Sequence, residues 1–292
     1  MRASRRILAL FLFLLAARGA HAAPIAVVAA ESTYGEIAQA IGGPYVAVRS
    51  IIASPRVDPH LFEAMPAVAV AVARAQVVVM NGIGYDAWMQ KLLLASPNPR
   101  RQVVVAADLA SNLIMPDRNP HVFYDPRVAL ITAARLATVF AGLDPAHAAQ
   151  FRANLAAFSQ QLLPVYGEIG AIIAAHPNLA ATGTEPVFGY MLRALGYRVV
   201  NQRVQQNVMN DTQPSPQEVV AFERSLRTHA VGLFVYNAQV QSPLTQRLMA
   251  LARQVHIPVV GVAEFAPAGS SYPQWQLATL RLVAAALNGT RR

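Results

Sequence analysis

Two histidines in this chain follow prolines in the same local pattern, in Asp58-Pro59-His60 and in Asn119-Pro120-His121. Proline fixes its own φ and biases the preceding residue away from the helical region, so each histidine is held on a constrained, non-helical backbone. Neutral imidazole is the commonest metal ligand in proteins, although a lone histidine in a loop is more often structural. The repeated pattern makes His60 and His121 candidate metal ligands that need support from the rest of the chain.

Acidic residues close to these histidines have other predicted roles. Asp125 precedes Pro126, which is typical of a helix N-cap followed by a first-turn proline. For Glu63, three residues after His60, capping or support of a ligand is favoured over coordination. Asp58 could orient the imidazole of His60, as carboxylates behind metal-binding histidines commonly do.

The remaining candidates fit ordinary structural roles. Asp211 lies on a polar segment and is predicted to be a turn residue rather than one that closes over a site. A solvated or internally satisfied side chain is expected for the four histidines predicted on helices or at their ends: His147, His176, His229 and His256.

Two other classes of function use similar residues. An enzyme with a metal triad of two histidines and a carboxylate needs an open coordination position and a general base. The sequence has no HExxH or GxSxG motif, so we do not expect an enzyme. A binding protein for an organic solute or a metal chelate would need stacking aromatic residues; residues that fit this role or the core are Tyr85, Trp88, Phe188 and Tyr236.

Short apolar runs of strand length alternate with helical patterns in both halves of the chain. In the first half the runs are 25–30, 46–52, 77–80 and 103–105, and in the second half 179–184, 199–200, 231–236 and 259–263. Unbroken apolar strands between helices are typical of a parallel sheet covered on both faces. The predicted fold class is α/β, with two lobes, each a mostly parallel sheet flanked by helices. Residues 201–216 are predicted to form a polar loop.

A long helix is predicted over residues 145–175. Its apolar stripe alternates spacings of four and three through Phe151, Leu155, Phe158, Leu162, Val165, Ile169 and Ile172. At ~1.5 Å per residue this segment would make a rod of roughly 45 Å, long enough to run along two lobes. A coiled coil is the alternative, but the flanking positions are mostly Ala and Gln rather than charged. Pro164 lies inside the stripe and is expected to kink or interrupt the helix.

The N-terminus predicts export. Three arginines precede the apolar run 7–17, and Ala20-His21-Ala22 is a small-x-small cleavage signal, so residues 1–22 are predicted to be a signal peptide. Loss of this segment removes four arginines and lowers the formal net charge from +9 to +5. The other arginines are scattered, so nucleic acid is not an expected partner. The sequence contains no cysteine, which excludes disulfides, thiolate sites and a lipid-anchored N-terminal cysteine.

Several motifs together resemble, in order and spacing, the zinc/manganese solute-binding proteins of ABC transporters (cluster A-I). The motifs are Asp58-Pro59-His60-Leu61-Phe62-Glu63, Asn81-Gly82-Ile83-Gly84 with Trp88, Asn119-Pro120-His121-Val122-Phe123 with Asp125-Pro126, and Leu143-Asp144-Pro145. The resemblance implies two α/β lobes joined by one long helix, with one divalent metal held between them by two residues from each lobe.

The resemblance also implies the ligands and the partner. His60 and His121 match the N-terminal pair of metal ligands, Glu185 matches the third, and Glu264 stands where the family usually has an aspartate. Two imidazoles and two carboxylates favour manganese or ferrous iron relative to an imidazole-rich site, although zinc is intrinsically bound more strongly. We expect a periplasmic monomer, not a lipoprotein, that delivers Mn2+, Zn2+ or Fe2+ to an ABC permease in the inner membrane.

The predicted organisation has four parts. They are a signal peptide over 1–22, an N-terminal α/β lobe over 23–143, a connecting helix over 144–176 and a C-terminal α/β lobe over 177–292.

Overall fold

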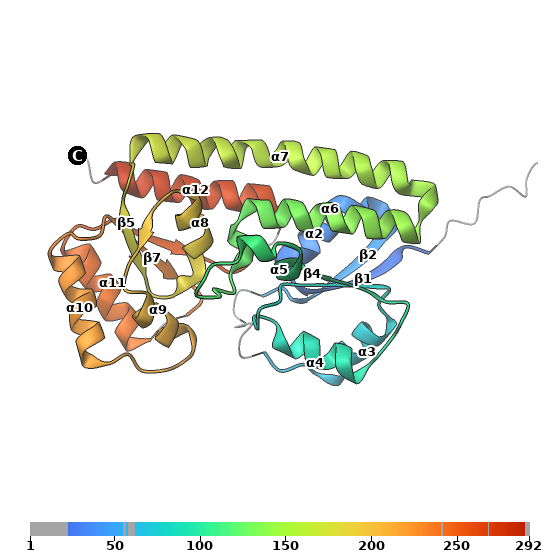
Figure 1. Ribbon diagram of the computed structural model, residues 1–292, viewed down its shortest axis with the longest axis horizontal. Helices are drawn as coiled ribbons and strands as arrows, with labels where there is room; N and C mark the ends of the chain where they lie inside the picture. The colour runs from blue at the N-terminus through green and yellow to red at the C-terminus, as the bar shows by residue number, and fades with distance from the viewer. Residues whose placement is uncertain (1–22, 55–56, 58–61, 241, 268, 290–292) are drawn as a thin grey trace, which may run out of the picture.

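The computed structural model describes residues 23–54, 57, 62–240, 242–267 and 269–289. The predicted signal peptide, Asp58 and His60 therefore lie outside the described residues. Two four-stranded parallel sheets stand side by side, and one long helix runs along both of them (Figure 1). The predicted α/β class with two lobes and a long connecting helix is confirmed.

The N-terminal sheet has the strand order β2-β1-β3-β4, and its three pairings are parallel. The strands are β1 (Ile25–Glu31), β2 (Val46–Ile52), β3 (Val77–Met80) and β4 (Gln102–Val105). Alternate side chains point to opposite faces of a strand. Accordingly Val27 belongs to one hydrophobic core and its neighbour Val28 to another.

Helices cover both faces of this sheet (Figure 1). They are α2 (Ser32–Gly42), α3 (Pro66–Arg74), α4 (Ala87–Ala95), α5 (Ala106–Leu109) and α6 (Pro126–Leu143), with short 3-10 turns at Gly43–Tyr45, Ser111–Leu113 and Val122–Tyr124. Among the described residues, α6 is the one helix long and apolar enough to cross a membrane, but half of it is buried and it packs against α2 and α7. We therefore assign α6 to the core.

The C-terminal sheet repeats the same arrangement, with the parallel order β6-β5-β7-β8. The strands are β5 (Ala180–Gly183), β6 (Arg198–Val199), β7 (Leu233–Asn237) and β8 (Val259–Val262), and the helices are α8 (Gly189–Ala194), α9 (Gln202–Met209), α10 (Pro216–Arg227) and α11 (Pro243–Gln254), with a 3-10 turn at Pro186–Phe188. The prediction of a polar loop over 201–216 is wrong, because α9 forms there. Gln202 and Arg203 are exposed, Gln205 is buried and donates to the Val200 carbonyl at 2.7 Å, and Val204 packs into the core of this lobe.

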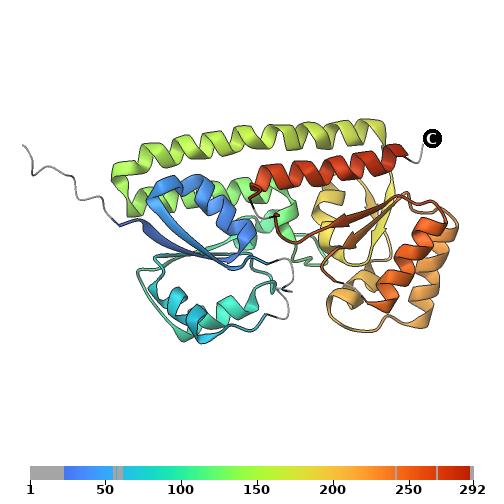
Figure 2. The same cartoon turned by 180° about the vertical axis from the view of Figure 1, so that it is seen from behind.

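Helix α7 (Ala148–Ala175) follows a 3-10 turn at Pro145–His147 and runs alongside α12 (Tyr272–Gly289), as the front and rear views both show (Figures 1 and 2). Its buried residues are Phe151, Phe158, Leu162, Val165, Ile169 and Ile172, which is the predicted stripe apart from the half-buried Leu155. Pro164 does not interrupt the helix. Because Pro164 is on the exposed side, its ring and missing N–H disturb the solvent face rather than the packed stripe.

The same parallel topology explains where the candidate ligands are. In each sheet the first strand of the lobe, β1 or β5, lies between two neighbours. The next strand in the chain, β2 or β6, lies on one side of it, and the following strand, β3 or β7, lies on the other side. Open α/β sheets bind ligands beyond the carboxyl ends of the strands at this point of reversal. In the C-terminal sheet, Glu185 follows β5 and Glu264 follows β8.

Candidate metal centre

His121 lies in the loop before α6 and is completely buried. The side-chain oxygen of Asn119 accepts a hydrogen bond from the backbone N–H of His121 at 3.0 Å and lies 2.8 Å from Nδ1 of its ring. An oxygen acceptor at this distance favours the tautomer with the proton on Nδ1. In that tautomer the lone pair of the imidazole ring is on Nε2.

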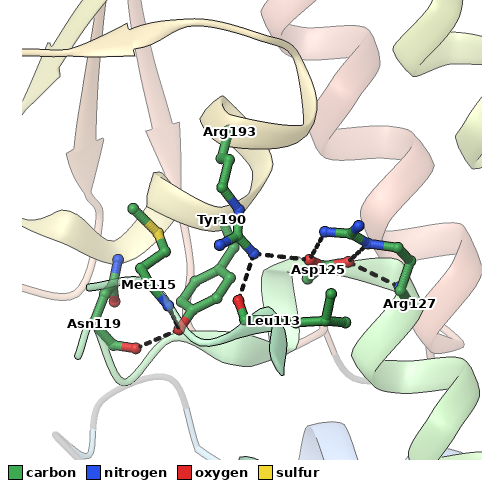
Figure 3. Close-up of polar contacts among 7 residues, drawn as sticks. All are labelled: Leu113, Met115, Asn119, Asp125, Arg127, Tyr190 and Arg193. Carbon is green, nitrogen blue, oxygen red and sulfur yellow. Dashed lines mark hydrogen bonds and ion pairs between the residues drawn. The ribbon is translucent and has the colours of Figure 1, made fainter. Parts of the chain in front are cut away.

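Asn119 also bonds to the other lobe. Its Nδ2 donates to the carbonyl of Pro186 at 2.7 Å, next to Glu185. The backbone carbonyl of Asn119 accepts from the Tyr190 hydroxyl at 2.9 Å (Figure 3). A Cβ at Gly189 would lie 2.5 Å from this Nδ2, so the approach depends on glycine there. Asn119 thereby links the loop of one candidate ligand to the loop of another.

A second polar contact between the lobes begins at Asp125, which is buried at the start of α6. Its carboxylate accepts from the backbone N–H of Arg127 at 3.0 Å, which confirms the predicted N-cap, and from the Arg127 guanidinium at 2.6 and 2.9 Å. Arg193 of α8 donates to the same carboxylate at 3.2 Å and to the carbonyl of Leu113 at 2.7 Å (Figure 3). Two cations neutralise this buried carboxylate and fix the loop that ends in α6.

Glu185 and Glu264 meet at the side chain of Asn237. Asn237 ends β7, and its single NH2 group donates to Glu185 Oε2 at 2.6 Å and to Glu264 Oε1 at 2.6 Å. All three residues are buried. Two buried carboxylates that share one amide donor repel each other, because little water screens their charges. Binding of a cation between them would relieve this repulsion.

Tyrosines of the N-terminal lobe contact the loop of Glu264. The Tyr85 hydroxyl donates to Glu264 Oε2 at 2.7 Å, and the Tyr124 hydroxyl donates to the carbonyl of Ala263 at 2.5 Å. The Tyr85 ring packs against the His121 imidazole, with centroids 5.7 Å apart. Burial, followed by the charge of Glu264, raises the pKa of Tyr85 well above its ordinary value, so this hydroxyl stays a donor.

Two of these residues have roles that the sequence reasoning missed. The sequence motifs do not indicate Asn237, and they indicate Tyr85 only as a stacking or core residue. Position is the available signal: Asn237 directly follows the predicted strand 231–236, and Tyr85 comes after the predicted strand 77–80, at the sheet edge where ligands bind.

The other candidates are placed elsewhere or lie outside the description. Glu63 and Asp211 are exposed. His147 pairs with Asp144 at 2.6 Å, and His176 lies 2.9 Å from the Asn288 side-chain oxygen. Within the described ranges, which omit His60, no three His, Cys, Asp or Glu side chains are close enough to hold one ion. The structure thus joins Glu185 to Glu264 and ties the His121 loop to the Glu185 loop, without bringing a full ligand set around one point.

Comparison with known proteins places the chain in a family. The model of the family "Zinc-uptake complex component A periplasmic" matches residues 27–286. The manganese-binding lipoprotein MntA of Bacillus subtilis is 25% identical over 58% of this chain and 60% of its own length, which is less than two thirds of that relative. The manganese ABC transporter substrate-binding lipoprotein PsaA of Streptococcus pneumoniae is 23% identical over 90% of this chain and 88% of its own length.

The fold has matches among solved structures. The periplasmic zinc-binding protein TroA of Treponema pallidum superposes with a TM-score of 0.77 at 18% identity, over 91% of this chain and 99% of that one. A crystal structure of ZnuA gives a TM-score of 0.72 at 22% identity, over 92% and 98%. By the match of the family model over most of its length, the chain belongs to the family of the periplasmic component A of zinc-uptake complexes.

Proposed function

We propose that this protein captures a divalent transition metal ion between its lobes and delivers it to an ABC permease in the inner membrane. Its family is that of a periplasmic metal-uptake component, and the relatives MntA and PsaA are named for manganese binding or transport. The roles of these relatives and the chemistry of the site in this chain support the same function.

The observation that carries the proposal is the pair Glu185 and Glu264 on the amide of Asn237. Two buried carboxylates within reach of one NH2 group have lost most of their hydration, and the two donors described for them, the Asn237 amide and the Tyr85 hydroxyl, carry no charge. A divalent cation supplies that compensation. We assign His60, His121, Glu185 and Glu264 as its ligands, with His60 coming from a segment outside the described residues.

The ligand types set the expected metal preference. Two neutral imidazoles and two carboxylates carry a charge of −2, which a divalent ion neutralises. Carboxylate oxygens favour Mn2+ or Fe2+ relative to an imidazole-rich site, while Zn2+ keeps the higher intrinsic affinity. We propose Mn2+ or Zn2+ as the transported ion, and the manganese relatives MntA and PsaA support the former.

Binding is expected with limited movement of the lobes. The contacts Asn119 to Pro186, Arg193 to Asp125 and Tyr85 to Glu264 cross between the lobes. Helix α7 also packs on helices of both lobes, α6 and α12 among them. A wide hinge opening would break these buried bonds, each worth about 1 kcal/mol or more.

The proposed organisation keeps the expected divisions, with a signal peptide over 1–22, lobes over 23–143 and 177–292, and the connecting segment 144–176 between them. We propose a monomeric binding protein that catalyses no reaction. We further propose that it is not a lipoprotein, unlike MntA and PsaA as they are named, because lipid attachment at the N-terminus requires a cysteine and the chain has none.

Calorimetry tests the proposal. Chelator-stripped protein is titrated with MnCl2 and with ZnCl2, alongside the variant His121→Ala. We expect one ion per chain and a large loss of affinity in the variant. Wild-type protein that binds neither ion would refute the proposal and would favour an organic solute or a metal chelate as the ligand.

A further inference from the structure

Glu31 is a buried acid that the proposed ligand set does not use. It is the last residue of β1 and precedes α2, and 1% of its surface is exposed. Glu31 occupies the N-cap position of α2, but its side chain makes no cap hydrogen bond. Its burial therefore has no explanation in the structure of α2.

The Glu31 carboxyl group is unsatisfied. Neither of its oxygens has a hydrogen-bond partner among the described residues, and the same is true of the neighbouring hydroxyl groups of Ser32 and Thr33. A buried carboxyl without a partner costs several kcal/mol, and most such groups in native proteins turn out to bind water or an ion. Four oxygen atoms at one strand end thus lack a partner in this part of the chain.

The Glu31 carboxyl interacts electrostatically with residues of both lobes. Burial raises its pKa well above the ordinary value, and the carboxylates of Asp86 and then Glu264 raise it further. Glu264 belongs to the opposite lobe. The charge of Glu31 also acts on the hydroxyl of Tyr85, the group that bonds to Glu264.

The two sheets show a matching position in the C-terminal lobe. The order β2-β1-β3-β4 corresponds to β6-β5-β7-β8, so β1 corresponds to β5 and β3 to β7. Glu31 ends β1, and Glu185 follows the end of β5 by two residues. Each lobe thus places a buried glutamate at the carboxyl end of its first strand, at the point of reversal where ligands bind.

The partners of the two glutamates differ. In the C-terminal lobe, Asn237 at the end of β7 donates to Glu185. In the N-terminal lobe, Asn81 follows β3, but it accepts from the Tyr34 hydroxyl at 2.6 Å and donates to the carbonyls of Gly82 and Pro120 at 2.9 and 2.8 Å. Asn81 is therefore committed to other groups and leaves the Glu31 carboxylate for a different partner.

We propose that Glu31 supplies a carboxylate oxygen to the cation captured between the lobes, which makes this a site with three carboxylates. The inference rests on the proposed metal-binding function. An additional oxygen ligand favours ions that take more oxygen donors, so it shifts selectivity toward Mn2+ relative to tetrahedral Zn2+. In this assignment the cation offsets the repulsion between the carboxylates of Glu31 and Glu264.

Glu31→Gln tests the proposal because it keeps the shape of the side chain and removes the charge. Glu36→Gln is the matched control, because Glu36 is an exposed glutamate on the helix that directly follows Glu31. Calorimetry on stripped protein should show a fall in Mn2+ affinity of at least about tenfold for Glu31→Gln, the size that even an outer contact of a metal site carries. The fall for Zn2+ should be smaller, and Glu36→Gln should match the wild type for both ions.

A second readout separates a ligand from a structural residue. The Tm of metal-free Glu31→Gln should be no lower than that of the wild type, since the variant loses only an unsatisfied acid, whereas a structural role would lower the Tm and the affinity together. Glu31→Asp, which keeps the charge and withdraws the oxygens by one methylene, should also lose Mn2+ affinity. Wild-type affinity in both variants overturns this inference alone, and a wild type that binds no ion overturns the proposed function with it.

Discussion

Replacing Asn119 with alanine is expected to weaken metal binding and to destabilise the protein by separable amounts. The change removes the acceptor of two donors on His121, at 3.0 and 2.8 Å, and the donor to the Pro186 carbonyl at 2.7 Å. Three buried polar groups then lack a partner, at about 1–3 kcal/mol each, so the free energy of unfolding should fall by at least about 3 kcal/mol.

The effect on binding comes from the freed imidazole of His121. Loss of the partner behind a metal-binding histidine typically costs 10–100-fold in affinity, or about 1.4–2.8 kcal/mol. Gly189→Ala should act in the same direction without touching His121, because its Cβ would lie 2.5 Å from the Asn119 Nδ2 and displace that side chain. Asn119→Asp keeps the oxygen beside Nδ1 and loses the bond to Pro186, so its affinity should fall less than that of Asn119→Ala.

Calorimetric titration with Mn2+ and denaturant unfolding of the metal-free proteins measure the two effects. Asn154→Ala is the control, because Asn154 also joins two segments through its amide, donating to the Ile41 carbonyl at 2.9 Å, far along α7 from the site. It should lower stability and leave affinity unchanged. Wild-type affinity in Asn119→Ala would refute the role of Asn119 in positioning His121.

Three further predictions concern other parts of the molecule. Glu264→Ala should lower Mn2+ affinity in calorimetry at least about tenfold, and unchanged affinity would remove Glu264 from the ligands. Burial raises the pKa of Asp86 from 3.8 to about 6, so the folded protein holds this proton to higher pH than the unfolded chain does. As pH rises from 4 to 7, the wild type should therefore lose about 2 kcal/mol of unfolding free energy relative to Asp86→Asn, and parallel pH profiles in denaturant unfolding would contradict this. Pro164→Ala in the exposed face of α7 should raise the free energy of unfolding by up to about 3 kcal/mol. Gly170→Ala, whose Cβ would meet no atom within 4 Å, should raise it by about 1 kcal/mol. A lower Tm in either variant would contradict the corresponding prediction.

Local patterns predicted the framework well because they record local physics. The alternation of apolar runs and helical patterns predicted two parallel sheets, and the Asp125-Pro126 pair predicted the helix start that the structure shows. Helix α7 forms along its whole apolar stripe despite Pro164, because Pro164 is not on the packed side of the helix. Propensity failed at 202–209, where a polar composition hid a helix whose few apolar residues, Val204 among them, reach the core.

The candidate site was only partly accessible to the same reasoning. Motif positions indicated His121, Glu185 and Glu264, whose ligand roles remain proposals, and His60 lies outside the described residues. The bridging role of Asn237 and the contact of Tyr85 with Glu264 join residues 27 and 179 positions apart in the chain. No spacing rule detects such pairs, because they depend on which strand ends the two sheets place opposite each other. The proposed role of Glu31 could not be predicted from the sequence for the same reason.

The most direct test of metal capture between the lobes is anomalous diffraction from crystals of the protein loaded with Mn2+. The account predicts one anomalous peak between the two sheets, within coordination distance of His121 Nε2 and a carboxylate oxygen of Glu185. A peak on the outer surface with neither residue as a ligand would contradict it.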